Sequence, residues 1–320
     1  MMTCENSNKE SVKQRIIRSV KEVLPNTTKT CIWIVRLTVV VSLLIVFLQY
    51  FNILPIISDF LSPAFNLIGL PGEAALPFVT GYFVNVYAAI SVMTAFDFDV
   101  RVITILSVMV MCAHNMITET AVQKKSGTSA VSIVLCRTLM AFVLAFCLNK
   151  VLPGQSGTNF IESATESQTL EEMLKSWLFS TGRLVLKMVT LIYILGILQK
   201  LMNEFGVINR LAKCLLPMLK LFGLPAKTAF LWIVANTLGL AYGAAVMIDE
   251  SKSGKLQKRD IDLLNYHICI SHSNFEDLFL LSAVGATWYV LLLARWVGSM
   301  ILVWGARLEY YVKEQLNRKR

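Results

Sequence analysis

Two short polar stretches, at residues 113–119 and 271–277, interrupt otherwise apolar sequence. Both contain residue types that can bind ions or polar molecules. These candidate site residues are His114, Asn115, Glu119, His272, Asn274, Glu276 and Asp277. A His titrates near neutral pH, and a carboxylate inside a membrane can carry a proton or a cation. Such groups are costly against lipid, so we interpret the two stretches as the binding site of a membrane transporter.

The two stretches share one spacing. In each, an acid lies five residues after the His, and an arginine lies eighteen residues after the acid. The corresponding sets are His114, Glu119 and Arg137 in the first half and His272, Asp277 and Arg295 in the second. Because the chain has only three His, this agreement indicates an internal duplication.

Two other interpretations of these residues remain open. Arg137 and Arg295 could act purely as charge partners, each pairing with the acid of its own half and fixing the polar stretch to the next helix. Replacing either member of such a pair would then impair the protein to a similar extent. A metal site built from His267, His272 and Glu276 would need a broken helix, because a five-residue spacing does not place both His on one helical face. We expect no bound metal and no cofactor.

The rest of the chain has the composition of a helical membrane protein. It is 55% hydrophobic and 16% charged, whereas soluble domains carry roughly 25% charged residues. Apolar runs of about 20 residues predict spanning helices. They lie near 32–51, 74–96, 128–149, 178–199, 227–248 and 284–306. The run at 102–113 is too short to cross, so we expect it to enter the membrane and return on the same side.

Charge and the duplication together predict opposite topologies for the two halves. The expected units are a basic cytoplasmic tail at 1–30, a first membrane repeat at 31–150, an acidic external linker at 151–176, a second membrane repeat at 177–308 and a basic cytoplasmic tail at 309–320. The fold would be an all-α polytopic membrane protein with two inverted repeats, each with about three spanning helices plus a re-entrant or broken segment. Eight full spans with parallel halves is the alternative.

Several functional classes are not indicated by the sequence. It contains no Walker lysine loop, no HExxH and no GxSxG, so we expect no enzyme. The seven Cys form no CxxC pair. No basic-aromatic stripe accompanies the net charge of +9, so we expect no nucleic-acid partner. The expected partners are the lipid bilayer and a small-molecule or ion substrate, and homo-oligomer formation is left open.

The sequence also resembles a known family. Gly72 to Pro77, Thr80 to Ala88, the matching stretch Lys227 to Tyr242 and the two His-containing stretches resemble the nucleoside recognition (Gate) family of bacterial inner-membrane proteins. Those proteins are related to spore maturation proteins and to the membrane parts of ferrous-iron and concentrative nucleoside transporters. The resemblance implies an inverted-repeat helical domain and leaves the substrate open.

We therefore predict a secondary transporter of a small polar solute or ion, for instance a nucleoside-like molecule. It would be a multi-pass protein of the bacterial inner membrane with both termini in the cytoplasm. Its substrate would bind between the two His-containing broken helices. The alternatives are a non-transporting membrane scaffold or assembly factor, and a divalent-metal transporter.

Overall fold

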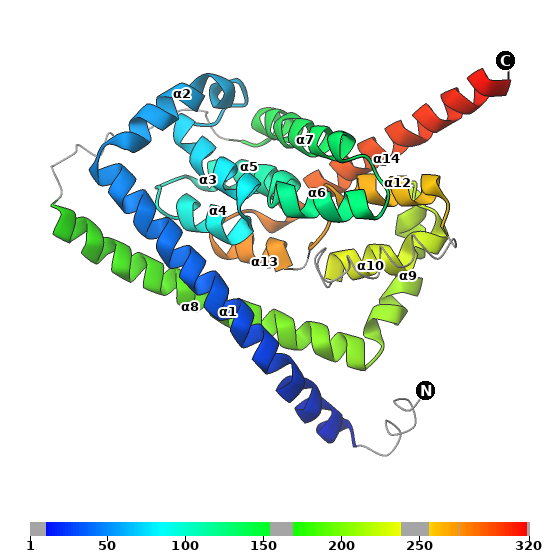
Figure 1. The fold of residues 1–320 in the computed structure, drawn as a ribbon, viewed down its shortest axis with the longest axis horizontal. Helices are drawn as coiled ribbons and strands as arrows, with labels where there is room; N and C mark the ends of the chain where they lie inside the picture. Colours follow the sequence, from blue (N-terminus) through cyan, green and yellow to red (C-terminus); the bar gives the residue numbers. More distant parts are fainter. Residues whose placement is uncertain (1–10, 154–168, 238–255, 275, 319–320) are drawn as a thin grey trace.

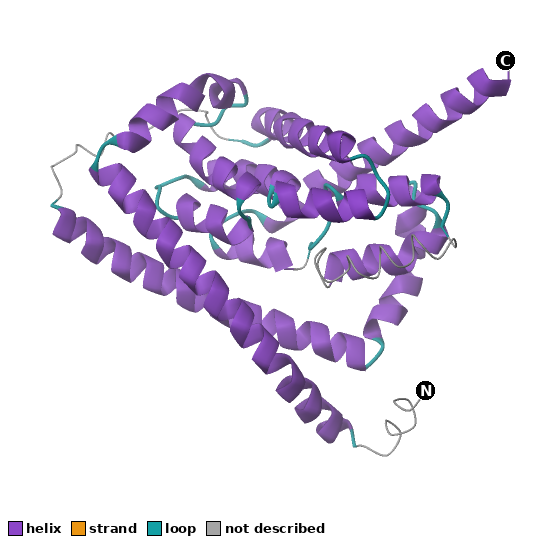
Figure 2. Ribbon diagram, in the orientation of Figure 1, coloured by secondary structure: helices purple, strands orange, loops and turns teal. Residues whose placement is uncertain are grey.

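The computed structural model describes residues 11–153, 169–237, 256–274 and 276–318, and within these ranges the chain forms helices and loops without a β-strand (Figure 1, Figure 2). By length and composition, five of the described helices can cross a membrane. They are Val12–Tyr50, Val100–Lys125, Ala130–Val151, Leu170–Met202 and Trp288–Arg318. The predicted class, an all-α polytopic membrane protein, is confirmed.

Two long helices, α1 (Val12–Tyr50) and α8 (Leu170–Glu204), pack against each other and cross the molecule in Figure 1. Their contacts are antiparallel and join Arg15 to Glu204, Thr28 to Tyr193 and Ser42 to Trp177. The Nε of Arg15 donates to a carboxylate oxygen of Glu204 at 2.9 Å, and this hydrogen bond lowers the pKa of Glu204. Because α1 begins at Val12, helix also covers much of the segment that we expected to be a tail.

A stretch that we predicted to span the membrane once forms two short helices, α3 (Ala75–Phe83) and α4 (Val86–Met93). Asn85 separates them, and its side chain caps the first turn of α4. A Cβ on Gly81 would lie 3.0 Å from the Cβ of Ala89, so the two helices fold back on each other as a hairpin. The predicted single span is therefore wrong, because mean hydropathy does not register the capping side chain inside the apolar stretch.

Two broken helices carry the polar stretches. In the first, α5 (Val100–Ala113) is separated by His114 and Asn115 from α6 (Met116–Lys125). In the second, α12 (Lys258–Ile268) is followed by α13 (Glu276–Ala283). Because α6 continues away from α5 in Figure 1, α5 and α6 together are long and apolar enough to cross. The short segment returning to its own side that we predicted here is thus replaced by a broken crossing helix.

The two broken helices run antiparallel and meet at both ends. Where α6 ends and α12 begins, Oγ1 of Thr128 donates to Oδ1 of Asp262 at 2.7 Å. Where α13 ends and α5 begins, the backbone N–H of Thr287 donates to Oγ1 of Thr104 at 3.0 Å. A long helix follows each broken one. These two long helices are α7 (Ala130–Val151) and α14 (Trp288–Arg318).

Each half also contains an amphipathic helix that ends in the same turn. These helices are α2 (Ile53–Leu67) and α9 (Val207–Leu221). Gly69 and Gly223 follow them in the left-handed conformation, with φ of 70° and 75°, which glycine adopts without steric cost. Short 3₁₀ segments, η2 (Gly72–Ala74) and η3 (Ala226–Thr228), come next, and α10 (Ala229–Thr237) follows η3. The remainder of the predicted span at 227–248 lies outside the described residues.

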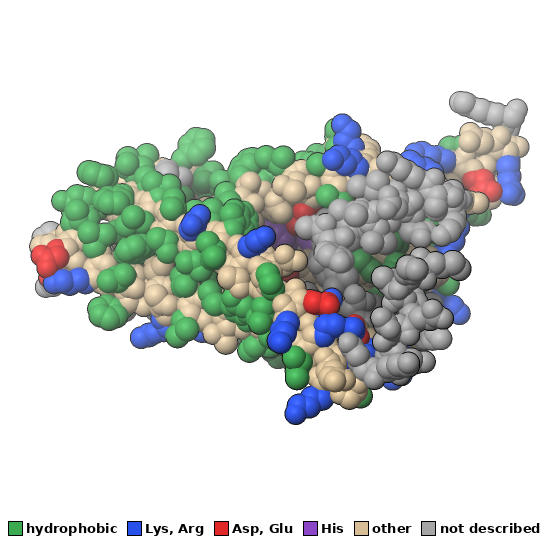
Figure 3. All heavy atoms as spheres, turned by 60° about the horizontal axis from the view of Figure 1, so that its bottom comes forward, with side chains coloured by type: hydrophobic (Ala, Val, Ile, Leu, Met, Phe, Trp, Pro, Cys, Tyr) green, Lys and Arg blue, Asp and Glu red, His purple; other side chains and the backbone are tan. Residues whose placement is uncertain are grey.

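The helix α5 lies at the centre of the molecule. Of its most apolar window, extended into α6, 78% is buried, against 33% for α1 and 39% for α14. Exposed apolar side chains instead cover much of the face drawn in Figure 3, with single Lys and Arg side chains between and around them. A helix that is apolar and buried on all sides belongs to a protein core, so the first polar stretch is placed inside the protein and away from lipid.

Candidate functional site

The backbone of each broken helix is held open in the same way. Asn115 and Ser273 both have a φ of 49°, the left-handed conformation that Asn tolerates better than most residues. The N–H of Asn115 donates to the carbonyl of Gly81 at 2.9 Å, and the N–H of Ser273 donates to that of Ala235 at 3.0 Å. Each break is therefore hydrogen-bonded to a short helix of its own half, the first to α3 and the second to α10.

A fully buried arginine completes each break. Arg137 on α7 donates to the carbonyls of Cys112 and His114 at 2.8 and 2.6 Å. Arg295 on α14 donates to the carbonyls of Ile270 and His272 at 2.6 and 2.7 Å. Backbone carbonyls at a helix end have no partner within the helix, so the two guanidinium groups satisfy groups that burial would otherwise leave unpaired.

The acids of the two halves are used differently. The predicted pair of Glu119 with Arg137 is present, at 2.8 Å. The predicted pair of Asp277 with Arg295 is not among the ion pairs of the described residues, because the third donor of Arg295, Nη1, binds Oδ1 of Asn274 at 2.8 Å. Asp277 pairs instead with a His of the other half.

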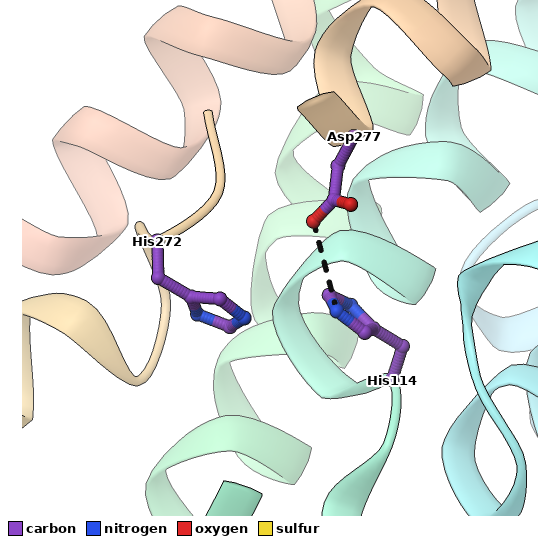
Figure 4. Close-up of side chains that lie close together, drawn as sticks. All are labelled: His114, His272 and Asp277. Carbon is purple, nitrogen blue, oxygen red and sulfur yellow. Dashed lines mark ion pairs between the residues drawn. The ribbon is translucent and has the colours of Figure 1, made fainter. Parts of the chain in front are cut away.

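Four side chains from the two halves meet in one buried cluster, which we call the His–acid cluster. Its members are His114, Glu119, His272 and Asp277. Nε2 of His114 lies 3.2 Å from Glu119 and 3.6 Å from Asp277, and Nε2 of His272 lies 3.1 Å from Glu119. The two imidazole rings are 5.3 Å apart between centroids, and Asp277 reaches His114 from α13 (Figure 4).

The protonation of both rings is constrained by the helices before the breaks. Nδ1 of His114 lies 3.0 Å from the carbonyl of Val110, and Nδ1 of His272 lies 2.7 Å from that of Ile268. A carbonyl only accepts, so Nδ1 carries the proton and Nε2 of a neutral ring carries a lone pair. Each Nε2 then faces a carboxylate oxygen, and two acceptors in contact require a proton or a cation between them. The cluster is therefore suited to hold positive charge.

The other predicted site residues lie around the cluster rather than in it. Asn115 contributes its backbone to the first break, as described above. Asn274 bonds Arg295, Ser271 and Asn236, and so braces the second break. Glu276 accepts a short hydrogen bond from the hydroxyl of Tyr87 on α4. Tyr87 was not among our predicted site residues. The sequence signal that could have indicated it is Asn85, a polar residue two positions earlier in an apolar stretch.

His267 is not part of the cluster. Its Nδ1 accepts from Nε1 of Trp232 at 3.1 Å, and its Nε2 lies 3.1 Å from Oγ of Ser299. Both ring nitrogens are thus engaged in the packing between α10, α12 and α14. The alternative metal site of His267, His272 and Glu276 is not assembled.

A cavity of about 700 Å³ adjoins the second break. Its wall is almost entirely apolar and includes Trp232, Trp288 and Trp296, with the amides of Asn236 and Asn274 beside them. The volume lies within the range of about 300–1,000 Å³ that is typical of small-molecule sites.

The chain is similar to proteins already grouped as a family. The sequence profile described as "Gate: Nucleoside recognition" matches residues 31–153. The uncharacterized membrane protein YvoD of Bacillus subtilis (strain 168) is 31% identical over 267 residues, which cover 82% of this chain and 85% of that protein. No solved structure matches the chain.

Proposed function

Because the chain belongs to the nucleoside recognition (Gate) family of membrane proteins, we propose that it is a secondary transporter whose small polar solute or ion binds at the His–acid cluster. The family and the apolar helices indicate a multi-pass membrane protein, and they support a transport-related role. The solute and its site belong to the proposal.

The observation that carries the proposal is the position of the cluster. Irregular backbone at membrane depth is tolerated only where protein buries it or where it lines a cavity. Here both breaks are buried, both lie within antiparallel broken helices, and their side chains converge on one point. Secondary transporters place their sites at such breaks, near the interface of two repeats.

Matching contacts in the two halves support an inverted arrangement of the repeats. The breaks, their arginines and the Gly69 and Gly223 turns recur at corresponding positions, and the broken helices run in opposite directions. With the basic segments on the cytoplasmic side, both termini would lie in the cytoplasm and the acidic linker outside. For a bacterial protein of this kind the location would be the inner membrane.

The test is flux in proteoliposomes that contain the full chain. Uptake of uridine, adenosine and inorganic cations is measured together with internal pH, for the native protein and for His114→Ala and His272→Ala. His267→Gln is the matched control, because it alters a buried His that lies outside the cluster. We expect the two cluster variants to abolish a flux that the control retains. Equal flux in all folded variants would contradict the proposal.

A scaffold role is the second candidate, and the arginines favour it. Arg137 and Arg295 bind backbone carbonyls, which is what a purely structural ion network requires. A scaffold predicts that every cluster substitution acts through stability alone. Variants that fold normally and lose flux would exclude it.

A further inference from the structure

The His–acid cluster offers four ligand atoms of the types that bind transition metals. One ring nitrogen each of His114 and His272 and a carboxylate oxygen of Asp277 all lie within 4.8 Å of one another. One carboxylate oxygen of Glu119 lies 3.2 Å from Nε2 of His114, and its other oxygen lies 3.1 Å from Nε2 of His272. Two halves of the chain thus supply one imidazole and one carboxylate each.

Three of the distances within the cluster are close to the ligand–ligand distances of tetrahedral coordination. With metal–ligand bonds of about 2.0–2.1 Å, neighbouring ligands of a tetrahedral ion lie roughly 3.3–3.4 Å apart. The three contacts of the cluster measure 3.1, 3.2 and 3.6 Å. Glu119 is not one of the three residues whose ligand atoms all lie within 4.8 Å of one another, and its two oxygens face different rings, so its carboxylate must turn to bind the same ion.

The groups behind the ligands are also those of a metal site. Metal-binding His residues usually donate their second ring nitrogen to a carbonyl or carboxylate, which fixes the tautomer. Here the carbonyls of Val110 and Ile268 take that role. The carboxylate of Glu119 is held by Arg137 at 2.8 Å. Oδ2 of Asp277 and Nε2 of His272 are buried and make no hydrogen bond within the described part of the chain.

The charges around the cluster set a condition on binding. Glu119 and Asp277 balance Arg137 and Arg295, and Glu276, held by Tyr87, adds one further negative charge nearby. Protons shared between the imidazole nitrogens and the carboxylates must leave when a metal ion enters. Metal binding is therefore expected to strengthen as pH rises. Two imidazole ligands favour Zn²⁺, Co²⁺ or Fe²⁺ over Mg²⁺ and Ca²⁺.

We propose that His114, His272, Glu119 and Asp277 bind one divalent transition-metal ion in tetrahedral geometry, and that this ion is the transported substrate. The identification as substrate rests on the transport function proposed above. The binding site itself rests on the geometry alone.

The experiment uses Co²⁺ as the probe, with the purified full-length chain in detergent. Tetrahedral Co²⁺ absorbs visible light far more strongly than six-coordinate Co²⁺, so the spectrum reports the geometry and a titration reports the stoichiometry. We expect one tetrahedral Co²⁺ per chain, displaced by Zn²⁺ and not by Mg²⁺, with weaker binding at lower pH. His272→Ala and Asp277→Asn should each weaken binding by more than about tenfold.

The control is again His267→Gln, which should bind Co²⁺ as the native chain does. Asp277→Asn keeps the size of the side chain and guards against loss through misfolding, which is checked by gel filtration and circular dichroism. No binding by the native chain, a six-coordinate spectrum, or equal binding by folded cluster variants would overturn the proposal. Flux of another solute without metal binding would refute the metal site and leave the transport function standing. Metal binding without any flux would refute the transport function and leave the metal site standing.

Discussion

Replacing Arg295 by methionine should destabilise the protein strongly. Its guanidinium donates to Ile270 O, His272 O and Asn274 Oδ1 at 2.6, 2.7 and 2.8 Å, and the side chain is fully buried. Methionine fills a similar volume and leaves all three acceptors without this donor. Breaking a buried charged network from one side costs about 3–5 kcal/mol of unfolding free energy. Single hydrogen bonds to charged groups contribute about 1.5–3 kcal/mol each, which agrees with that total after partial relaxation.

The free energy of unfolding is measured by equilibrium denaturation in mixed micelles for Arg295→Met, Arg295→Lys and Arg36→Met. Lysine cannot serve three acceptors at once, so it should recover only part of the loss. Arg36 is exposed on α1, and its replacement should change stability by less than about 0.5 kcal/mol. A loss below about 1 kcal/mol for Arg295→Met would refute our account of how the break is held.

Three further predictions concern other parts of the fold. Gly223→Ala should lower the unfolding free energy by about 1–2 kcal/mol, measured in the same assay, because φ is +75° and the new Cβ meets Trp304 at 3.1 Å. The pKa of Glu204 is lowered in the folded state, so the stability that its carboxylate contributes is present above the unfolded-state pKa and is lost as pH falls below 4.5, the ordinary pKa of Glu. Glu204→Gln should remove that acid sensitivity in unfolding experiments. Single Cys residues at 124, 257 and 97 can be tested with an impermeant thiol reagent in a background without native Cys. Positions 124 and 257 should be labelled from the same side of the membrane and position 97 from the other, because Nζ of Lys258 donates to the carbonyl of Gly127 at 2.5 Å. Labelling of 124 and 257 from opposite sides would contradict the broken crossing helix.

Spacing was enough to find the two breaks and the four side chains that meet in the His–acid cluster. The duplicated His, acid and Arg stood out because polar groups are rare in apolar sequence and because their intervals repeat. Hydropathy likewise predicted the membrane class, because apolar runs long enough to cross a bilayer can be recognised without knowing how the helices pack.

Individual side chains decide which segments can cross and which fold back, and a mean hydropathy over a window does not register them. Asn85 caps α4 and turns one predicted span into a hairpin. The short run at 102–113 is completed as a crossing by α6, because Arg137 and Gly81 hold the break between the two helices. These are contacts between distant parts of the chain, and no local pattern encodes them.

The partners within the cluster were likewise settled only by the tertiary structure. Sequence proximity suggested that each acid would pair with the arginine of its own half. Asn274 takes the third donor of Arg295 instead, so Asp277 is left to face His114 across the interface of the two halves. The sequence by itself determined that the molecule has two equivalent polar breaks. Only the antiparallel packing of the broken helices decided that the two breaks meet in one cluster, because that packing brings the imidazole of one half within reach of the carboxylate of the other.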